Sequence, residues 1–229
     1  MTGASVAGQP VSGWRRRATS IEVAAMAGIV CAIAWSISLR GLLAGPDLDA
    51  SPDEVARHYA DTGGANVGLL LALMVIGAVA YLWFVGVIRS RLGARESRMV
   101  GTVFLGASVL LTGLMLVAAS ALAAPSLLVD VSGRAPDPDA SQLFRALATV
   151  ELGVFAARIA TLVMFSTASL ALRTGALPRW LVVVTYVVGV AEFVNITLST
   201  PALYVFPAWI ALVSVVLLAR RPHLTPAAA

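Results

Sequence analysis

The chain has 229 residues, of which 59% are apolar and only 12% are charged, and its mean hydropathy is +0.89. This balance excludes an ordinary soluble domain and indicates a membrane protein. The 16 basic residues are all arginine and stand against 12 acidic residues, which gives a formal net charge of +4. Because the arginines lie in short clusters between apolar runs, with no basic face interleaved with aromatic residues, we expect a lipid bilayer and not a nucleic acid as the partner.

Six apolar runs follow one another, each long enough to cross a hydrocarbon layer about 30 Å thick. We therefore predict an all-α polytopic membrane bundle of six transmembrane helices. The predicted spans are residues 21–44, 67–88, 99–124, 143–172, 179–199 and 201–220. They form one membrane domain at 21–220, between a cytoplasmic N-terminal segment at 1–20 and a cytoplasmic tail at 221–229.

The first apolar run follows three arginines and therefore resembles the start of a signal sequence. A cleaved signal peptide has an apolar core of only about 7 to 15 residues, whereas this run is longer. We predict a retained first span, with cleavage near Ala44 as the alternative.

A stripe of small residues recurs every four positions along the first span, at Ala24, Gly28, Ala32 and Ser36. Such stripes allow a neighbouring helix to approach closely. We expect it to pack inside the bundle, and the alternative is a seam for a second copy or another membrane protein.

The loop after the first span predicts a short surface helix near residues 51–62. Ser51 and Glu54 form a capping box, Pro52 suits the first helical position, and Gly63 or Gly64 can end the helix. Its apolar face would rest on the outer membrane surface or on the rim of the bundle, and a lid over a ligand is the more functional interpretation. The second outer loop is predicted to be irregular from Pro125 to a cap at Asp139 or Ser141.

Orientation follows from the arginines. With the N-terminus inside, the opposite loops keep only Arg57 and Arg134, so the positive-inside rule places both termini in the cytoplasm and the protein in the cytoplasmic membrane. The cytoplasmic segments hold Arg15, Arg16, Arg17, Arg89, Arg91, Arg95, Arg98, Arg173, Arg179, Arg220 and Arg221.

The turn between the fourth and fifth spans, FSTASLALRTGALPRWLVVVTYVVGVAEF, resembles the corresponding turn of a bacterial family of six-span membrane proteins catalogued only as a domain of unknown function. The stretch HYADTGGANVGLLLALMVIG, a polar outer segment that leads into the second span, resembles the same family less closely. The resemblance implies six helices, and it carries over no activity and no functional residues.

Charged residues inside the spans are the main functional candidates. Counted from the cytoplasmic ends, Arg158 lies roughly 21 Å deep and Glu192 roughly 18 Å deep, so we expect them to pair. Glu151 at roughly 31 Å and Arg40 at roughly 28 Å would form a second pair. A lone charge in hydrocarbon is costly, and such groups pair or face water.

Two further polar residues accompany this expected intramembrane site. Thr161 adds a hydroxyl one turn from Arg158, and Asn195 shares a polar face of the fifth span with Glu192. We therefore take Arg158, Glu192, Asn195, Glu151, Arg40 and Thr161 as candidate site residues.

Two functions remain open at this point. The first is a non-enzymatic structural or accessory membrane protein whose buried ion pairs fix the helices. The second is a small transporter, or a protein that conducts protons or anions along a polar path at Arg158 and Glu192. Neither histidine lies in a span, there is one cysteine, and no motif of a hydrolase, metalloenzyme or phosphate-binding loop is present, so we expect no catalytic residue, metal or cofactor.

Overall fold

The computed structural model describes residues 13–62, 66–92, 98–134, 136–175, 177–195 and 200–220. The tail at 221–229, the first twelve residues and the end of the predicted span 179–199 lie outside them. Within the described ranges every regular element is helical: α1 (Gly13–Leu42), α2 (Pro52–Thr62), α3 (Val67–Leu92), α4 (Arg98–Ser132), α5 (Pro138–Val150), α6 (Ala157–Thr174), α7 (Arg179–Val194) and α8 (Val205–Ala219). A π-helical segment, η2 (Glu151–Ala156), joins α5 to α6, and a 3-10 helix, η3 (Thr200–Tyr204), precedes α8.

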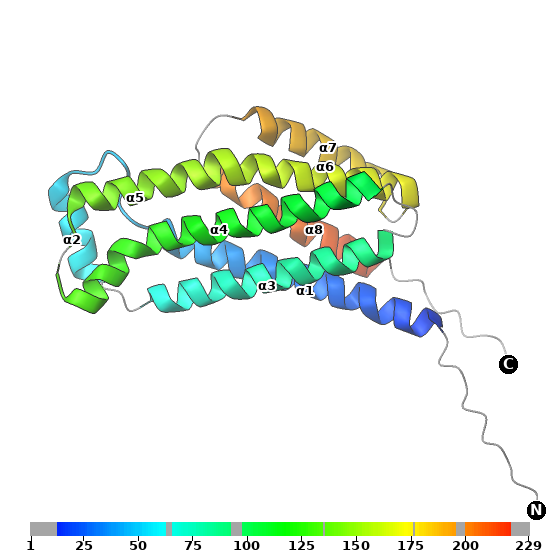
Figure 1. Cartoon of the computed structure of the whole chain (residues 1–229), viewed down its shortest axis with the longest axis horizontal. Helices are drawn as coiled ribbons and strands as arrows, with labels where there is room; N and C mark the ends of the chain where they lie inside the picture. Colours follow the sequence, from blue (N-terminus) through cyan, green and yellow to red (C-terminus); the bar gives the residue numbers. More distant parts are fainter. Residues whose placement is uncertain are drawn as a thin grey trace, which may run out of the picture.

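The helices form an elongated bundle (Figure 1). We call the end where α1 begins and α8 ends the terminal end, and the opposite end the α2 end. Helices α7 and α8 lie along the half nearer the terminal end, whereas α2, α5 and the second part of α4 build the other end. In this arrangement α1 packs against α3 and α8, and α6 packs against α4 and α7.

Among the residues that the structure describes, five helical stretches are long and apolar enough to cross a membrane: Glu22–Leu42, Val67–Arg89, Met99–Ser132, Pro138–Thr174 and Thr200–Ala219. The fifth span predicted from the sequence coincides with α7, which has only 16 residues. At 1.5 Å per residue this helix is about 24 Å long, less than the usual hydrocarbon thickness. The structure therefore identifies five candidate spans where the sequence predicts six.

Two predicted boundaries are wrong. Helix α4 continues through Pro125 to Ser132. A proline inside a long helix removes only one backbone hydrogen bond, and the turns on either side keep the others. The next helix begins at Pro138, and its cap is Asp137, whose carboxylate accepts a hydrogen bond from the Asp139 amide, so neither Asp139 nor Ser141 is the cap.

An aromatic cluster fills the centre of the bundle between α1, α3 and α8. The ring centres of Trp35 and Tyr81 lie 5.2 Å apart, and Phe206 lies 5.8 Å from Tyr81 and 5.6 Å from Trp209. All three polar donors of these rings find acceptors: Trp35 Nε1 donates to the Met74 carbonyl at 3.2 Å, the Tyr81 hydroxyl to Ser108 at 3.2 Å, and Trp209 Nε1 to Thr185 at 3.0 Å. Large rings can be buried here because their polar atoms are satisfied inside the protein.

The small-residue stripe of α1 is used within the chain. Ala24, Gly28 and Ala32 are buried, and a Cβ atom added at Gly28 would overlap the Ser214 hydroxyl of α8. The stripe therefore brings α1 and α8 into close contact, as expected of packing inside the bundle. A seam for a second copy along these residues stays a prediction.

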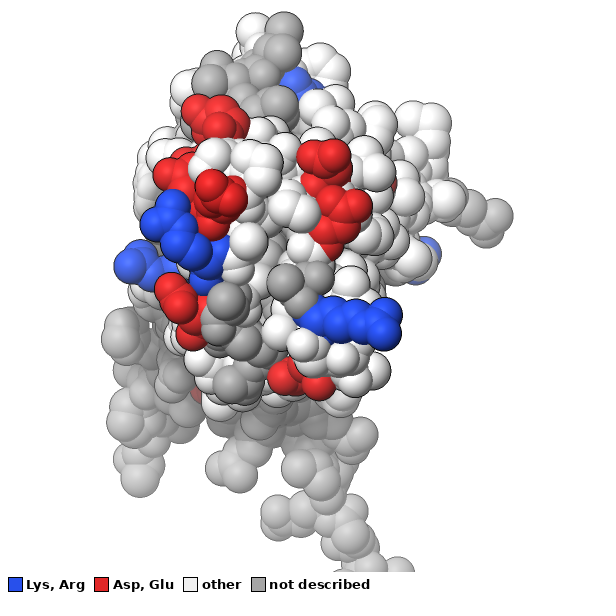
Figure 2. All heavy atoms as spheres, turned by 90° about the vertical axis from the view of Figure 1, so that its left-hand side faces the viewer, with Lys and Arg blue, Asp and Glu red and all other residues white. Residues whose placement is uncertain are grey.

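Acidic side chains concentrate at one end of the bundle. Figure 2 shows acidic side chains gathered on the face of the α2 end. The acidic residues carried by the elements of this end are Asp47, Asp49, Asp53, Glu54, Asp61, Asp130, Asp137 and Asp139. The terminal end carries the exposed arginines Arg89, Arg173, Arg179 and Arg220, and the α2 end also carries the exposed arginines Arg57 and Arg134.

The packing of Trp35 generates a test of the fold. An alanine at Gly77 would overlap the buried Trp35 ring, whereas a Cβ at Gly86 of the same helix meets nothing within 4 Å. We expect Gly77→Ala to cost about 1–3 kcal/mol through overpacking. Gly86→Ala should be neutral or stabilise by about 0.5–1 kcal/mol through helix propensity. Thermal denaturation of the detergent-solubilised variants measures the difference, and equal midpoints would contradict the packing.

Candidate functional site

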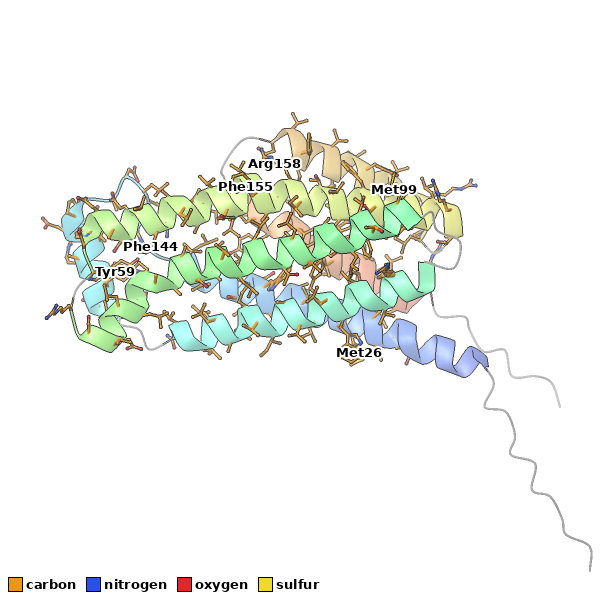
Figure 3. The ribbon with its side chains drawn as sticks, in the orientation of Figure 1. Met26, Tyr59, Met99, Phe144, Phe155 and Arg158 are labelled. Atoms are coloured by element: carbon orange, nitrogen blue, oxygen red, sulfur yellow. The ribbon has the colours of Figure 1, made fainter. Side chains whose placement is uncertain are left out.

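Arg158, the central residue of the predicted intramembrane site, binds two backbone carbonyls. Its guanidinium donates to Gly153 O, and it donates to Asn195 O at 2.9 Å. Asn195 is the C-terminal cap residue of α7, where carbonyls lack helical donors and the helix dipole favours a cation. Arg158 thus caps a neighbouring helix, and Figure 3 shows it near the start of α6, beside the C-terminal end of α7.

The π-helical segment explains how Gly153 can accept this bond. Between Glu151 and Ala156 the backbone winds more widely, and the Ala157 amide donates to the Leu152 carbonyl five residues earlier. The changed register disturbs the regular ladder, and the Arg158 side chain bonds a carbonyl within it. Single π-helical turns recur at functional sites, so this segment is a candidate in its own right.

No ion pair joins Arg158 to Glu192 in the described part of the chain, so the expected direct contact is not formed. The Arg158 charge is near enough to attract the Glu192 carboxylate, but the hydrogen bonds of Arg158 go to backbone carbonyls. Glu192 lines a cavity of about 40 Å³ together with Thr161 and mainly apolar residues of α1, α4, α6 and α8. The Thr161 hydroxyl donates to the Arg158 carbonyl of its own helix at 2.8 Å. The site therefore has room for a few water molecules and no more.

The second expected pair, Arg40 with Glu151, is also absent from the described residues. Arg40 is exposed, whereas one carboxylate oxygen of Glu151 is buried and has no hydrogen-bond partner. Similar depth along two helices is not sufficient for contact, because the rotation of each helix decides which face its side chain leaves from. Arg40 can reach polar surroundings through its long stem, and Glu151 stays at the start of η2.

A larger cavity, of about 330 Å³, lies at the α2 end. Its walls come from the end of α1, the start of α3, the second part of α4 and the start of α5, and α2 contributes His58 and Tyr59. Leu42, Leu70 and Leu122 supply apolar walls, and Arg145, His58 and Tyr59 supply polar ones. This size and mixture are typical of a small-molecule binding site. We call it the α2-end cavity.

Three polar groups of the α2-end cavity converge around Gly45. A Cβ atom at Gly45 would lie 3.1 Å from Arg145 Nη1, 3.9 Å from His58 Nε2 and 4.0 Å from the Tyr59 hydroxyl. Burial raises the pKa of Tyr59 above its ordinary value, and the nearby Arg145 charge opposes part of that shift. The hydroxyl is therefore protonated at neutral pH and can donate a hydrogen bond.

Arg145 is held in place by contacts that leave part of its guanidinium available. Nη2 donates to the Leu43 carbonyl at 3.2 Å and lies 3.5 Å from a carboxylate oxygen of Asp47. The Arg145 side chain is only 17% exposed, whereas that of Asp47 is 88% exposed. An exposed partner is screened by water and contributes little. The cation thus faces the cavity with a weak counter-ion.

Helix α2 covers this end of the bundle and is fixed to it. The predicted capping box is confirmed: Ser51 N donates to Glu54 Oε2 at 2.8 Å, and these bonds hold the pKa of Glu54 below its usual range. Val55 is 1% exposed, and Gln142 Nε2 donates to the Ala50 carbonyl at 2.7 Å. Of the two resting places expected for this helix, the structure shows the rim of the bundle.

The sequence analysis missed the α2-end cavity. Arg145 lies inside the predicted span 143–172 and is not among the candidate site residues, and His58 is placed only outside the spans. One feature of the sequence points to this site: Arg145 is a cation two residues inside an apolar run. Its convergence with His58 and Tyr59 depends on how α2 folds back over α5, which local patterns do not contain.

The chain matches no protein-family model, no curated protein and no solved structure. The resemblance of residues 165–193 to a family of six-span proteins stays a prediction.

The bonds of Arg158 predict unequal effects of two substitutions. Arg158→Met removes two charge-assisted hydrogen bonds and the cap of α7, so we expect a loss of about 1.5–3 kcal/mol in stability. Glu192→Gln should change stability by less than about 0.5 kcal/mol. Denaturant unfolding measures both, and hydrogen exchange should show faster opening of residues 191–195 only in Arg158→Met.

A direct ion pair would give a different pattern. Each single change would then destabilise the protein strongly, and the double variant Arg158→Met with Glu192→Leu would recover much of the loss. That recovery would overturn the assignment of Arg158 as a helix cap.

Proposed function

We propose that this chain is a non-enzymatic accessory membrane protein that binds an amphiphilic small molecule in the α2-end cavity. The observation that carries the proposal is the cavity itself, of about 330 Å³, with leucine side chains on one part of its wall and Arg145, His58 and Tyr59 on another. A ligand with an apolar tail and a polar head would satisfy both parts at once.

The position of the cavity supports the same ligand class. It lies where the apolar helices of the bundle meet the acidic and arginine side chains of the α2 end, so its surroundings change from apolar to polar over a short distance (Figures 1 and 2). Leu69 lines it and is 64% exposed, which leaves an apolar side chain at its rim. In a bilayer this level corresponds to the interface, where amphiphiles place their head groups.

We further propose six spans with both termini in the cytoplasm, in the cytoplasmic membrane. Helix α7 would be the short sixth span, reaching across a locally thinned layer with α6 beside it. The exposed arginines support this topology, because Arg89, Arg173, Arg179 and Arg220 lie at the terminal end, against Arg57 and Arg134 at the α2 end.

Cysteine labelling tests the topology. The native Cys31 is fully buried, so the maleimide should not label it and the signal comes from the introduced cysteine. Asp49→Cys at the α2 end should react with a membrane-impermeant maleimide on intact cells, whereas Arg173→Cys at the terminal end should react only after the membrane is opened. The reverse pattern would invert the proposed orientation, and labelling of both in intact cells would contradict it.

A purely structural function based on buried ion pairs has less support, because neither expected pair is present in the described residues. The α6–α7 contact is stabilised by the bond from Arg158 to the Asn195 carbonyl and by the close approach at Gly189, where a Cβ would meet the Phe165 ring. These contacts support a rigid scaffold, and the scaffold positions the α2-end cavity.

Conduction of protons or anions remains the second candidate. It is favoured by one observation, the buried and unpartnered oxygen of Glu151, together with Glu192 at the small cavity. Carboxyl side chains within membrane-spanning helices mark proton pathways in pumps and transporters. If this were the function, Glu151→Gln and Glu192→Gln would each reduce proton flux into liposomes, and unchanged flux in both would exclude it.

A glycine pair tests binding in the α2-end cavity. Gly45→Leu would place a side chain among Arg145, His58 and Tyr59, whereas Gly68→Leu adds the same side chain at an open position of α3. We expect native mass spectrometry to show retained dodecyl amphiphiles on the wild-type protein and on Gly68→Leu, and at least a tenfold loss on Gly45→Leu, because filling the cavity excludes the ligand. Equal retention in all three proteins, or none in any, would contradict binding at this site.

A further inference from the structure

We infer that the polar head of the ligand is an acid anion, a carboxylate or a phosphate monoester, that binds Arg145 by displacing Asp47. This inference rests on the proposed function and names the ligand class of the same cavity. The observation behind it is the convergence of one guanidinium, one imidazole and one phenol on a single point of the wall, around Gly45.

The donors at this point suit an acidic head group. Arginine presents a planar fork that matches carboxylate and phosphate oxygens, and the protonated Tyr59 hydroxyl offers another hydrogen bond. His58 Nε2 lies 3.9 Å from the same position and adds a third polar group around it. Acidic side chains that could repel an anion occur on the surface of this end, but among the described residues only Asp47 forms an ion pair with Arg145.

The glycine at residue 45 makes room for the head group. Any side chain there would occupy the space that the three polar groups surround, since its first atom would already lie 3.1 Å from Arg145 Nη1. The head group can therefore approach the backbone of the α1–α2 connection closely, which a larger residue would prevent.

Asp47 is a counter-ion that a ligand can replace. Its carboxylate lies 3.5 Å from Arg145 Nη2 on the solvent side, and its side chain is 88% exposed. Exposed pairs of this kind contribute only about 0.2–1 kcal/mol, which corresponds to a factor of about one and a half to five in affinity. A buried anion on the cavity side, where water is scarcer, interacts more strongly with the same guanidinium.

The apolar part of the cavity distinguishes an acidic lipid from a free anion. Leu42, Leu70 and Leu122 would remain in contact with water if inorganic phosphate alone were bound. An alkyl chain covers these walls and adds hydrophobic free energy in proportion to the area it buries. We therefore assign the site to an acidic amphiphile and treat the free anion as an outcome of the test.

The experiment compares three ligands on the full-length protein in a neutral detergent, with retained ligand counted by native mass spectrometry. Dodecyl phosphate carries both parts of the recognised chemistry, dodecanol carries only the tail, and inorganic phosphate carries only the head. We expect dodecyl phosphate to bind at least tenfold more tightly than dodecanol, and inorganic phosphate to show no retention.

Two acidic residues provide a matched pair of variants. Asp47→Asn and Asp49→Asn change the net charge equally at exposed positions, but only Asp47 touches Arg145. We expect Asp47→Asn to increase the affinity for dodecyl phosphate about two- to fivefold, because the competing carboxylate is removed, and Asp49→Asn to leave it unchanged. Neither substitution removes a buried contact, so both variants should fold.

Arg145→Gln completes the design. It should lower the affinity for dodecyl phosphate about tenfold or more while leaving dodecanol unchanged. Equal responses of Asp47→Asn and Asp49→Asn, or equal binding of dodecyl phosphate and dodecanol, would overturn the inference while the proposed function survived.

Two other results have separate meanings. Retention of inorganic phosphate as tight as that of dodecyl phosphate would replace the amphiphile with a free anion and overturn the inference. Absence of any amphiphile from the wild-type protein would overturn the proposed function itself.

Discussion

A hydrocarbon layer supplies no hydrogen-bond partners, and this constraint organises the structure. Polar groups placed at depth depend on the protein for partners, so the interior bonds run to backbone carbonyls and hydroxyls, and in the described residues only Glu151 Oε2 and Ser214 Oγ are buried side-chain atoms without one. Trp35 bonds the Met74 carbonyl, Ser38 bonds the Leu70 carbonyl, and Tyr81 bonds Ser108. These bonds tie α1 to α3 and α3 to α4, and the aromatic cluster packs around them.

Arg158 follows the same rule in a way that composition does not suggest. The two arginines and two glutamates of the predicted site have no net charge, but this does not require them to form ion pairs. A guanidinium has five N–H donors, and backbone carbonyls can accept their hydrogen bonds. The irregular η2 segment and the end of α7 both offer such carbonyls, and Arg158 binds one from each. Glu192 therefore lies beside the small cavity, and Glu151 keeps one buried oxygen without a partner. Neither forms the ion pair that the sequence predicts.

The α2-end cavity exists because elements of different length meet at that end. Helix α4 extends past Pro125, and the continuous helical stretch of α5, η2 and α6 already begins at Pro138. Both therefore project beyond the short helices α7 and α8. Helix α2 rests on these projections through Val55 and through the bond from Gln142 to Ala50. The space beneath it is lined by leucines from the bundle and by polar groups from the covering elements, which is what gives the cavity its two kinds of wall.

The sequence by itself determined the helical class, the apolar stretches and the capping box of Ser51 with Glu54, because these depend on composition, period and local hydrogen bonds. It also located the close-packing stripe through Gly28. The predicted end of α4 and start of α5 are wrong, and α4 runs on because the buried Pro125 is kept within a helix whose neighbours hold it. Only the tertiary structure decided the partners of Arg158 and the meeting of Arg145, Tyr59 and His58 at Gly45. Those contacts depend on the rotation and relative height of whole helices, which residue spacing along one helix does not fix.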